Sequence, residues 1–239
     1  MGEDGLAGGE KILVISPHPD DVDFGCSGTI AKWSRRGMEI VYVICTSGDK
    51  GTDDPQMRPE ALAAVREEEQ QAAAEGVGVR EVSFLRLKDG ELENNREFRG
   101  ILVRVVRKYR PDIVLSMDPA NNRFENPYVS HSDHRATALA VFDAIYPAAG
   151  NRNFFPEQLV DGLTPHSVDG VYFFGTDRPN TWVDITGTIE AKIAALRCHK
   201  SQMTDFENLE AWVRDRHSQL GREKGMTYAE AFRYLGIPR

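Results

Sequence analysis

Short apolar runs alternate with longer amphipathic segments through the first two thirds of the chain. The runs have the length of buried strands and cover 11–16, 39–48, 81–87 and 112–117. The segments between and after them have helical periodicity and cover 27–37, 58–78, 95–110 and 130–147. Apolar strands that alternate with helices form a mostly parallel sheet with helices on both faces. The sequence therefore predicts an α/β fold.

The last third of the chain is less regular. Its patterns predict two strands, a helix and a final helical segment, at 170–175, 181–186, 187–203 and about 209–235. The sequence shows no internal repeat, low-complexity stretch or linker, and 239 residues suit one large domain. We therefore expect a single α/β domain over 11–239. The acidic, glycine-rich segment 1–10 lacks the pattern of a signal peptide, and we expect it to be a disordered lead.

Composition narrows the class of protein. The net charge of −8 and the lack of a dense basic patch argue against nucleic acid as a partner. No apolar stretch approaches the length of a membrane span. Cys26, Cys45 and Cys198 are odd in number and widely spaced, so the sequence predicts neither a disulfide framework nor a cysteine-based zinc site. We expect a cytoplasmic protein that binds neither nucleic acid nor a membrane.

Polar loops follow each of the first four predicted strands. They read SPHPDDVDFGCSG (16–28), TSGDKG (46–51), KDGELE (88–93) and DPANNRFENP (118–127). In an open α/β sheet ligands bind outside the carboxyl ends of the strands, so we expect the four loops to meet at one edge. The sequence contains neither GxGxxG after the first strand nor GxxxxGK[ST], so the usual cradle for nucleotide phosphates is missing.

Two loops carry residues suited to a metal ion. His131 and His134 project from one face of a predicted helix, and His18 and Asp21 have the same spacing in a tight turn. Two imidazoles and one carboxylate hold a zinc-type ion with one position open for water, and they also suit ferrous iron. The ion lowers the pKa of that water, and Asp20, next to a candidate ligand, could take the proton. The sequence therefore favours a hydrolytic site with Zn²⁺, Fe²⁺ or another divalent metal.

Each of these residues also has a purely structural interpretation. Asp20, Asp21 and Asp23 could shape a turn or favour the positive end of the helix that follows. Asp133 could form a capping box with Ser130, because SHSD matches S-x-x-D. A single histidine is more often a hydrogen-bonded or surface residue than a ligand. Together, at one predicted edge of the sheet, the residues favour a metal site over these alternatives.

The same residues resemble the signatures of a known family. PHPDD (17–21) is similar to the (A/P)HPDD motif of the PIG-L/LmbE-like de-N-acetylases, and HSDH (131–134) is similar to their HPDH motif. Further segments with family likeness are 46–51, 66–79, 87–92, 111–119, 183–202 and 225–233. The chain departs from the family pattern at Ser132, where proline is usual, and at Glu75, where leucine is usual. Neither residue is a candidate ligand, so the expected chemistry is unchanged.

The resemblance implies a Rossmann-like α/β fold and a zinc-dependent hydrolase that removes acetyl from an N-acetylated amino sugar or a related glycoconjugate. The metal ligands that it implies are His18, Asp21 and His134. Asp20 would be the general base, His131 would stabilise the oxyanion or protonate the leaving amine, and Asp133 would hold the imidazole of His131 in its working tautomer. The resemblance also implies a homo-oligomer, either a trimer or a hexamer.

Three more residues are candidates for substrate binding. Arg66 matches a family arginine that helps to hold the substrate, but it could equally pair with Glu69 on the helix surface. Asp49 could line the pocket or shape the turn after the second strand. Tyr128 lies in a polar loop that leads into His131 and could face the substrate.

Other polar residues carry structural expectations. We expect Asp23 to be solvated, and His166 and His217 to lie at the surface. For His199 we favour an interaction with the C-terminal dipole of a helix and keep a role in the pocket open.

Two other functions compete with deacetylation. A hydratase on the same scaffold would use the same metal ligands but would need several cations for a polycarboxylate, and the candidates are Arg66, Arg123 and Lys50. Another amidase activity on the same scaffold is a further alternative. A non-enzymatic binding module predicts a missing base or ligand, so it ranks last because Asp20 and the ligands are present.

Overall fold

The computed structural model describes residue 6 and residues 8–121, 124–125 and 128–238. Within these residues, seven strands form one sheet in the order β3-β2-β1-β4-β7-β9-β8. The strands are β1 (Lys11–Ser16), β2 (Glu39–Thr46), β3 (Glu81–Leu87), β4 (Ile113–Met117), β7 (Gly170–Phe174), β8 (Thr181–Asp184) and β9 (Ala229–Gly236). The strands β1 to β4 and β7 run parallel, and β9 is antiparallel to both of its neighbours. The prediction of a mostly parallel sheet is confirmed.

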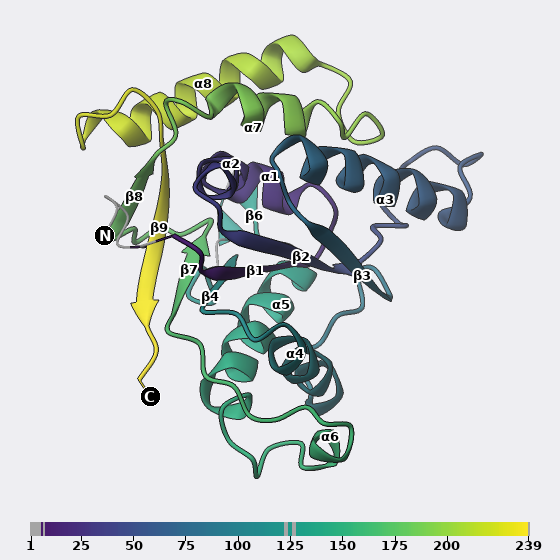
Figure 1. The fold of residues 1–239 in the computed structure, drawn as a ribbon. Coiled ribbons are helices and arrows are strands. Elements are labelled where there is room, and N and C mark those ends of the chain that lie inside the picture. Colours follow the sequence, from purple (N-terminus) through teal and green to yellow (C-terminus); the bar gives the residue numbers. More distant parts are fainter. Residues whose placement is uncertain (1–5, 7, 122–123, 126–127, 239) are drawn as a thin grey trace.

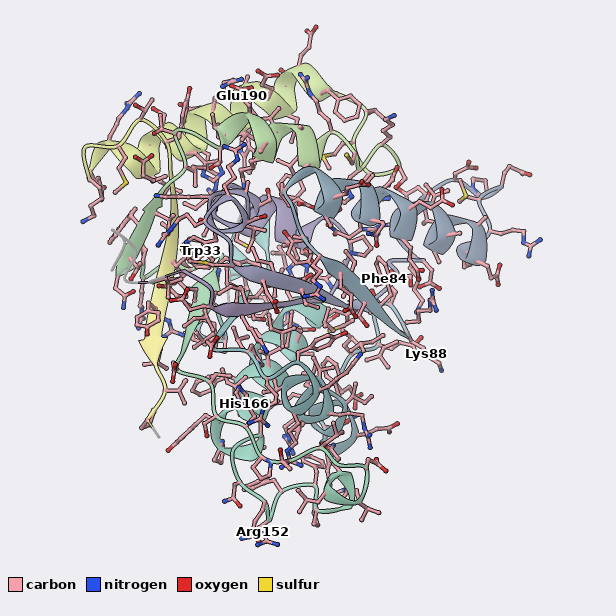
Figure 2. The ribbon with its side chains drawn as sticks, in the orientation of Figure 1. Trp33, Phe84, Lys88, Arg152, His166 and Glu190 are labelled. Carbon is pink, nitrogen blue, oxygen red and sulfur yellow. The ribbon has the colours of Figure 1, made fainter. Side chains whose placement is uncertain are left out.

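Helices cover both faces of the sheet, as predicted (Figure 1). One face carries α1 (Asp21–Gly25), α2 (Ser27–Arg35), α3 (Pro59–Gly76), α7 (Ile189–Leu196) and α8 (Phe206–Arg222). The other face carries α4 (Arg96–Tyr109), α5 (Ser132–Asp143) and α6 (Glu157–Val160). Figure 2 shows Glu190 of α7 and Arg152, which follows α5, at opposite ends of the molecule with the sheet between them.

Alternate side chains of the central strands face two separate apolar layers. Along β1, Ile12 and Val14 belong to the core beneath α2, and Leu13 and Ile15 belong to the core beneath α4 and α5. All four side chains are at most 2% exposed. Trp33 of α2 lies against the first layer (Figure 2). Burial on both faces explains why the strand sequences are continuously apolar.

The central strands β1 and β4 lie side by side, and the chain leaves them in opposite directions. After β1 it continues to β2 on one side, and after β4 it continues to β7 on the other. Open α/β sheets bind ligands at the carboxyl ends of strands where the direction changes in this way. The loop after β1 and the segment between β4 and α5 both begin there. A short hairpin of β5 (Phe124–Glu125) and β6 (Tyr128–Val129) precedes α5.

The segment 209–235 differs from its prediction as one helical stretch. Helix α8 ends at Arg222, Gly225 has a φ of +70°, and the chain returns as β9 between β7 and β8. Ala229 and Phe232 of β9 are fully buried. The sequence YAEAFRYL contains good helix formers, so local propensity favours a helix. Pairing with two neighbouring strands overrides that propensity.

Smaller differences concern the ends of helices. The helix predicted at 187–203 is α7, which ends at Leu196, and the helix predicted at 130–147 changes into a π-helical turn after Asp143. A separate short helix, α1, precedes α2. In the part of the chain that the structure describes, no helix is both long and apolar enough to cross a bilayer.

Candidate active site and metal centre

The loop after β1 turns sharply at Asp20 and enters α1 at Asp21. Asp20 has a φ of 87° and a ψ of −32°, a region that residues with a side chain rarely adopt. The backbone N–H of His18 donates to Oδ2 of Asp21 (3.0 Å), which folds the loop onto the first turn of the helix. The turn therefore places three predicted site residues together at the carboxyl end of β1.

The first turn of α5 is organised around Asp133. His131 is the N-cap residue, and its Nδ1 accepts the backbone N–H of Asp133 (3.2 Å). The alternative of a capping box between Ser130 and Asp133 is wrong, because the carboxylate of Asp133 turns inward. It accepts the backbone N–H groups of Gly90 (2.7 Å) and Leu92 (3.2 Å), and it is fully buried. These contacts tie the loop after β3 to the start of α5.

Asp21 lies between two imidazoles. Its Oδ2 is 3.2 Å from Nδ1 of His18, and its Oδ1 is 3.2 Å from Nε2 of His134. Burial opposes the charged form, but His134 and His18 hold the pKa of Asp21 well below its usual range. The ring centroids of His18, His131 and His134 are 5.0, 5.3 and 5.4 Å apart. The structure thus brings the three predicted ligands together, with His131 beside them.

Two further carboxylates contact the outer nitrogen of His18. Its Nε2 is 3.1 Å from Oδ1 of Asp89 and 3.3 Å from Oδ2 of Asp133. Burial opposes an imidazolium, but hydrogen bonds with Asp133, Asp21 and Asp89 raise the pKa of His18 to about 11. Asp89 is not among the site residues predicted from the sequence. Its place in KDGELE, one of the four polar loops, was the available signal.

The donor set fits a divalent metal ion of the zinc type. Two imidazoles and one carboxylate, here from His18, His134 and Asp21, are a common catalytic set that leaves one position open. The carboxylates on the outer nitrogen of His18 favour a proton there and leave Nδ1 as the ligand atom. One nitrogen from each of His18, His131 and His134 also lies within 4.8 Å of the others, so His131 faces the same space.

Asp20 borders this cluster on the side of α3. Its side chain is 17% exposed, and its Oδ2 lies 3.3 Å from the guanidinium of Arg66. The buried Arg66 also donates to the carbonyl of Pro19 (2.8 Å). Burial and the adjacent Asp21 carboxylate raise the pKa of Asp20 to about 7, against the lowering effect of Arg66. Asp20 can therefore exchange a proton near neutral pH.

His131 is suited to donate a hydrogen bond while neutral. Burial, together with the charges of His18 and His134, lowers the pKa of His131 below its ordinary value. Because its Nδ1 accepts the N–H of Asp133, the neutral ring carries its hydrogen on Nε2. The structure therefore links Asp133 to His131 through the backbone, whereas the carboxylate of Asp133 contacts His18.

The prediction that Asp23 is solvated is wrong. Asp23 is fully buried, and its Oδ2 contacts Nε2 of His199 (2.8 Å) and Nε2 of Gln70 (2.9 Å). The side-chain oxygen of Gln70 accepts the backbone N–H of Asp20 (2.8 Å). His199 lies beyond the end of α7, and its side chain serves this network rather than the last turn of that helix. The sequence did not reveal these contacts, because they join residues far apart in the chain.

The two remaining histidine predictions have different outcomes. His217 is 3% exposed and its Nδ1 lies 2.9 Å from the carbonyl of Ala229, so its predicted surface location is wrong. His166 is half-buried, and its Nε2 lies 2.7 Å from the carbonyl of Pro111. Neither histidine contacts the cluster around Asp21 within the described residues.

The candidate substrate residues lie in three places. Arg66 points into the protein, and Glu69 instead contacts the backbone and hydroxyl of Ser201, so the alternative of an Arg66–Glu69 surface pair is wrong. Asp49 is half-buried in the loop after β2. The backbone of Tyr128 lies in β6, and its side chain falls outside the described part of the chain.

Comparisons with known proteins agree with this geometry. The diacetylchitobiose deacetylase of Thermococcus kodakarensis is 39% identical over 95% of this chain and 83% of that protein. The structure of the N,N′-diacetylchitobiose deacetylase from Pyrococcus horikoshii matches with a TM-score of 0.88 and 37% identity, over 95% of this chain and 84% of that one. A 4-carboxy-2-hydroxymuconate hydratase from Pseudomonas putida matches with a TM-score of 0.78 and 25% identity, over 96% and 97% of the two chains.

The family comparison covers the part of the chain that carries both signatures. The profile of the PIG-L family, described as GlcNAc-PI de-N-acetylase, matches residues 13–145. This range includes the loop after β1 and the first turn of α5, the two segments that build the candidate metal centre. The resemblance stated from the motifs is therefore confirmed, and the chain belongs to the PIG-L de-N-acetylase family.

Proposed function

We propose that the protein is a metal-dependent hydrolase that removes the acetyl group from an N-acetylated amino sugar or a related small glycoconjugate. One observation carries the proposal: Asp21 lies between His18 and His134, with Asp20 beside it at the carboxyl end of β1. This arrangement combines a metal-binding set with a separate proton acceptor. The two deacetylase relatives, which by name act on diacetylchitobiose, support the same class of substrate.

In amide hydrolysis, three residues would bind the metal and a fourth would transfer the proton. His18, Asp21 and His134 would hold a divalent ion, which when bound polarises a carbonyl and acidifies water. As the oxygen of the attacking water bonds to the acetyl carbon, Asp20 takes the proton of that water. When the C–N bond breaks, Asp20 returns the proton to the sugar nitrogen. The products are acetate and a free amine.

His131 would stabilise the charge that develops on the acetyl oxygen. Its Nε2 carries the hydrogen, because Nδ1 is occupied by the N–H of Asp133. A neutral donor fixed before the reaction stabilises an oxyanion without reorganisation. Asp133 thus acts as the orienting residue for His131, by its backbone, and contacts the metal ligand His18 with its carboxylate. For Asp49 and Tyr128 we keep the proposal that they line the substrate side of the pocket.

Acetate release tests the proposal. Purified protein loaded with zinc is incubated with N-acetylglucosamine, diacetylchitobiose and N-acetylglucosaminyl conjugates, and free acetate and new amine are measured together. We expect equal amounts of both products from at least one sugar, and none after removal of the metal by a chelator. Metal-loaded wild-type protein that releases no acetate from any member of the panel would overturn the proposal.

The likeness to the Pseudomonas putida hydratase makes water addition the second candidate. A hydratase for a polycarboxylate needs free cations at the site. Arg66 is engaged with Pro19 and Asp20, Lys50 pairs with the exposed Glu91 (2.9 Å), and Arg123 lies outside the described residues. The engaged cations favour deacetylation. Loss of the absorbance of an unsaturated dicarboxylate on incubation with the protein would favour the hydratase instead.

We further propose zinc as the resident metal, a homo-oligomeric state and a cytoplasmic location. The choice of zinc is supported by the two imidazoles and one carboxylate of the site, a set that ferrous iron shares. The free cysteines Cys26 and Cys45, both buried, and the half-buried Cys198 are consistent with a reducing compartment. Metal analysis of protein purified without added metal and light scattering of the purified protein test the first two proposals.

A further inference from the structure

The backbone at Asp20 has a conformation that needs support. Its positive φ of 87° turns the chain so that its carboxylate and that of Asp21 leave the loop in different directions. An L-residue in this region is strained unless surrounding contacts hold it. Helix α1 provides no side-chain cap at this position, so the support comes from elsewhere in the fold.

The support comes from α3, which holds both sides of the Pro19–Asp20 peptide. The guanidinium of Arg66 donates to the carbonyl of Pro19 (2.8 Å), and the side-chain oxygen of Gln70 accepts the N–H of Asp20 (2.8 Å). Arg66 and Gln70 are four residues apart and therefore lie on one face of α3. Both residues are at most 5% exposed. The peptide cannot rotate without breaking one of these two hydrogen bonds.

A buried carboxylate fixes the orientation of the Gln70 amide. The NH₂ group of Gln70 donates to Oδ2 of Asp23 (2.9 Å), so the amide oxygen must face Asp20. Nε2 of His199 contacts the same oxygen of Asp23 (2.8 Å). Gln70, Asp23 and His199 are all fully buried, and Oδ1 of Asp23 and Nδ1 of His199 have no hydrogen-bond partner among the described residues, so burial of these polar groups is costly. Apolar side chains would fill this space at lower cost.

We propose that Gln70, Asp23 and His199 are positioning residues that fix the backbone of Asp20 and thereby aim its carboxylate at the attacking water. The proposal rests on the proposed function, in which Asp20 is the general base. His199 holds Asp23, Asp23 sets the amide of Gln70, and Gln70 holds the N–H of Asp20. None of the three contacts the residues assigned to the metal through a hydrogen bond within the described residues.

The first test compares Gln70→Leu with Gln71→Leu. Gln71 is the exposed neighbour on the same helix, so the pair makes the same substitution with and without loss of the contact to Asp20. A misplaced general base lowers kcat, and we expect a loss of about 10–100-fold for Gln70→Leu and none for Gln71→Leu. The KM and the bound zinc of Gln70→Leu should match wild type. A kcat near wild type, or a loss in proportion to lost zinc, would overturn the proposal.

Combination with Asp20→Ala separates positioning from a general structural effect. If Gln70 acts through Asp20, adding Gln70→Leu to Asp20→Ala should change the residual rate by less than about twofold. If Gln70 supports the site in another way, adding Gln70→Leu to Asp20→Ala should lower the residual rate by the same factor by which Gln70→Leu alone lowers the wild-type rate. That second result would contradict the proposal.

A pair of variants at His199 tests the far end of the network and serves where Gln70→Leu fails to fold. His199→Gln keeps an N–H donor near the position of Nε2, and His199→Leu removes it. We expect His199→Gln to stay within about threefold of the wild-type kcat and His199→Leu to fall by about tenfold or more. Equal kcat values for the two variants would contradict the role of the hydrogen bond.

A crystal structure of zinc-loaded Gln70→Leu distinguishes failure of this inference from failure of the proposed function. We expect Asp20 to leave its positive φ and its carboxylate to turn away from the metal centre. An unchanged Asp20 overturns the positioning role, whatever the substrate. If wild-type protein hydrolyses no N-acetylated sugar but Asp20 moves in the variant, the proposed function fails and the positioning role stands.

Discussion

Asp89→Asn isolates what the carboxylate next to Nε2 of His18 contributes to the proposed metal site. The substitution is nearly isosteric and removes one charge from a group whose Oδ1 lies 3.1 Å from Nε2 of His18. The other oxygen of Asp89 accepts the backbone N–H of Lys50 (2.9 Å), and asparagine can keep that acceptor. The loop should therefore keep its conformation. What changes is the group that faces Nε2 of His18, where an uncharged amide NH₂ replaces a charged acceptor.

The expected magnitude follows from the partners of His18. Burial opposes the charged form of Asp89, but the hydrogen bond with His18 lowers its pKa to about 2, so the group is ionised at neutral pH. Removal of a carboxylate that orients a ligand histidine weakens metal binding roughly 10–100-fold. Asp133 still lies 3.3 Å from the same nitrogen. We therefore expect Asp89→Asn to weaken zinc binding at the lower limit of this range, about tenfold, which corresponds to about 1.4 kcal/mol of binding free energy.

The assay is a competition titration of zinc against a chromogenic chelator at neutral pH. Glu91→Gln is the matched control, because it removes one negative charge two residues further along the same loop. Its carboxylate is 53% exposed and contacts Lys50. Asp89→Asn should bind zinc about tenfold more weakly than wild type, and Glu91→Gln within about twofold of it. Equal zinc affinities for the two variants would refute the reasoning.

Three other predictions address the base, the arginine and a buried histidine. Asp20→Ala should keep its zinc and lose about 100-fold or more in kcat, whereas His134→Ala should lose both zinc and activity, as metal analysis and acetate release will show; an active Asp20→Ala protein would mean that the base is misassigned. Gly48→Ala places a Cβ 2.3 Å from the guanidinium of Arg66 at a φ of +64°, whereas a Cβ at Gly76 meets nothing within 4 Å. In urea unfolding, Gly48→Ala should lose about 1–3 kcal/mol of the free energy of unfolding and Gly76→Ala should lose none. Equal free energies of unfolding for the two variants would contradict the packing argument. Burial and Lys192, against Glu230, lower the pKa of His217 from 6.5 to about 4. Stability from this neutral imidazole is present above pH 6.5 and declines by up to about 3 kcal/mol as the pH falls to 4. His217→Asn, which keeps a donor for Ala229 but does not titrate, should lose less stability over this range in urea unfolding; an equal loss would contradict the assignment.

The sequence was sufficient to predict the parallel strands of the sheet and the place of the candidate site. Strands buried on both faces are apolar along most of their length, so β1, β2 and β4 could be located from their residues alone. The carboxyl ends of parallel strands share one edge, and that rule brought the loop of His18 to the helix of His131 and His134. The contact between Asp21 and His134 joins residues more than a hundred positions apart in the chain. Topology made that contact predictable.

Features that depend on a partner from another element were not predictable from local pattern. The segment of β9 contains good helix formers and becomes a strand only because β7 and β8 both pair with it. Asp89 has the sequence context of an ordinary turn residue. Only its contact with Nε2 of His18 connects it to the candidate site. His199 was placed at a helix end by periodicity, whereas its partner Asp23 lies in α1. In each case the missing information was the identity of the neighbour.

The surroundings of three neighbouring carboxylates give each of them a different role. They belong to Asp20, Asp21 and Asp23. The three carboxylates lie within four positions, yet the positive φ of Asp20 and the turn of α1 send them to different surroundings. Asp21 faces two imidazoles, which favour its charged form and suit the role of metal ligand that we propose for it. Asp20 is largely buried and lies next to the negative charge of Asp21, and both effects favour its protonated form. Asp23 faces Gln70 and His199 in the interior. An exchange of roles would therefore require a change in the backbone at Asp20 and not in the acids themselves, which is why we expect the residues that hold this peptide to determine activity.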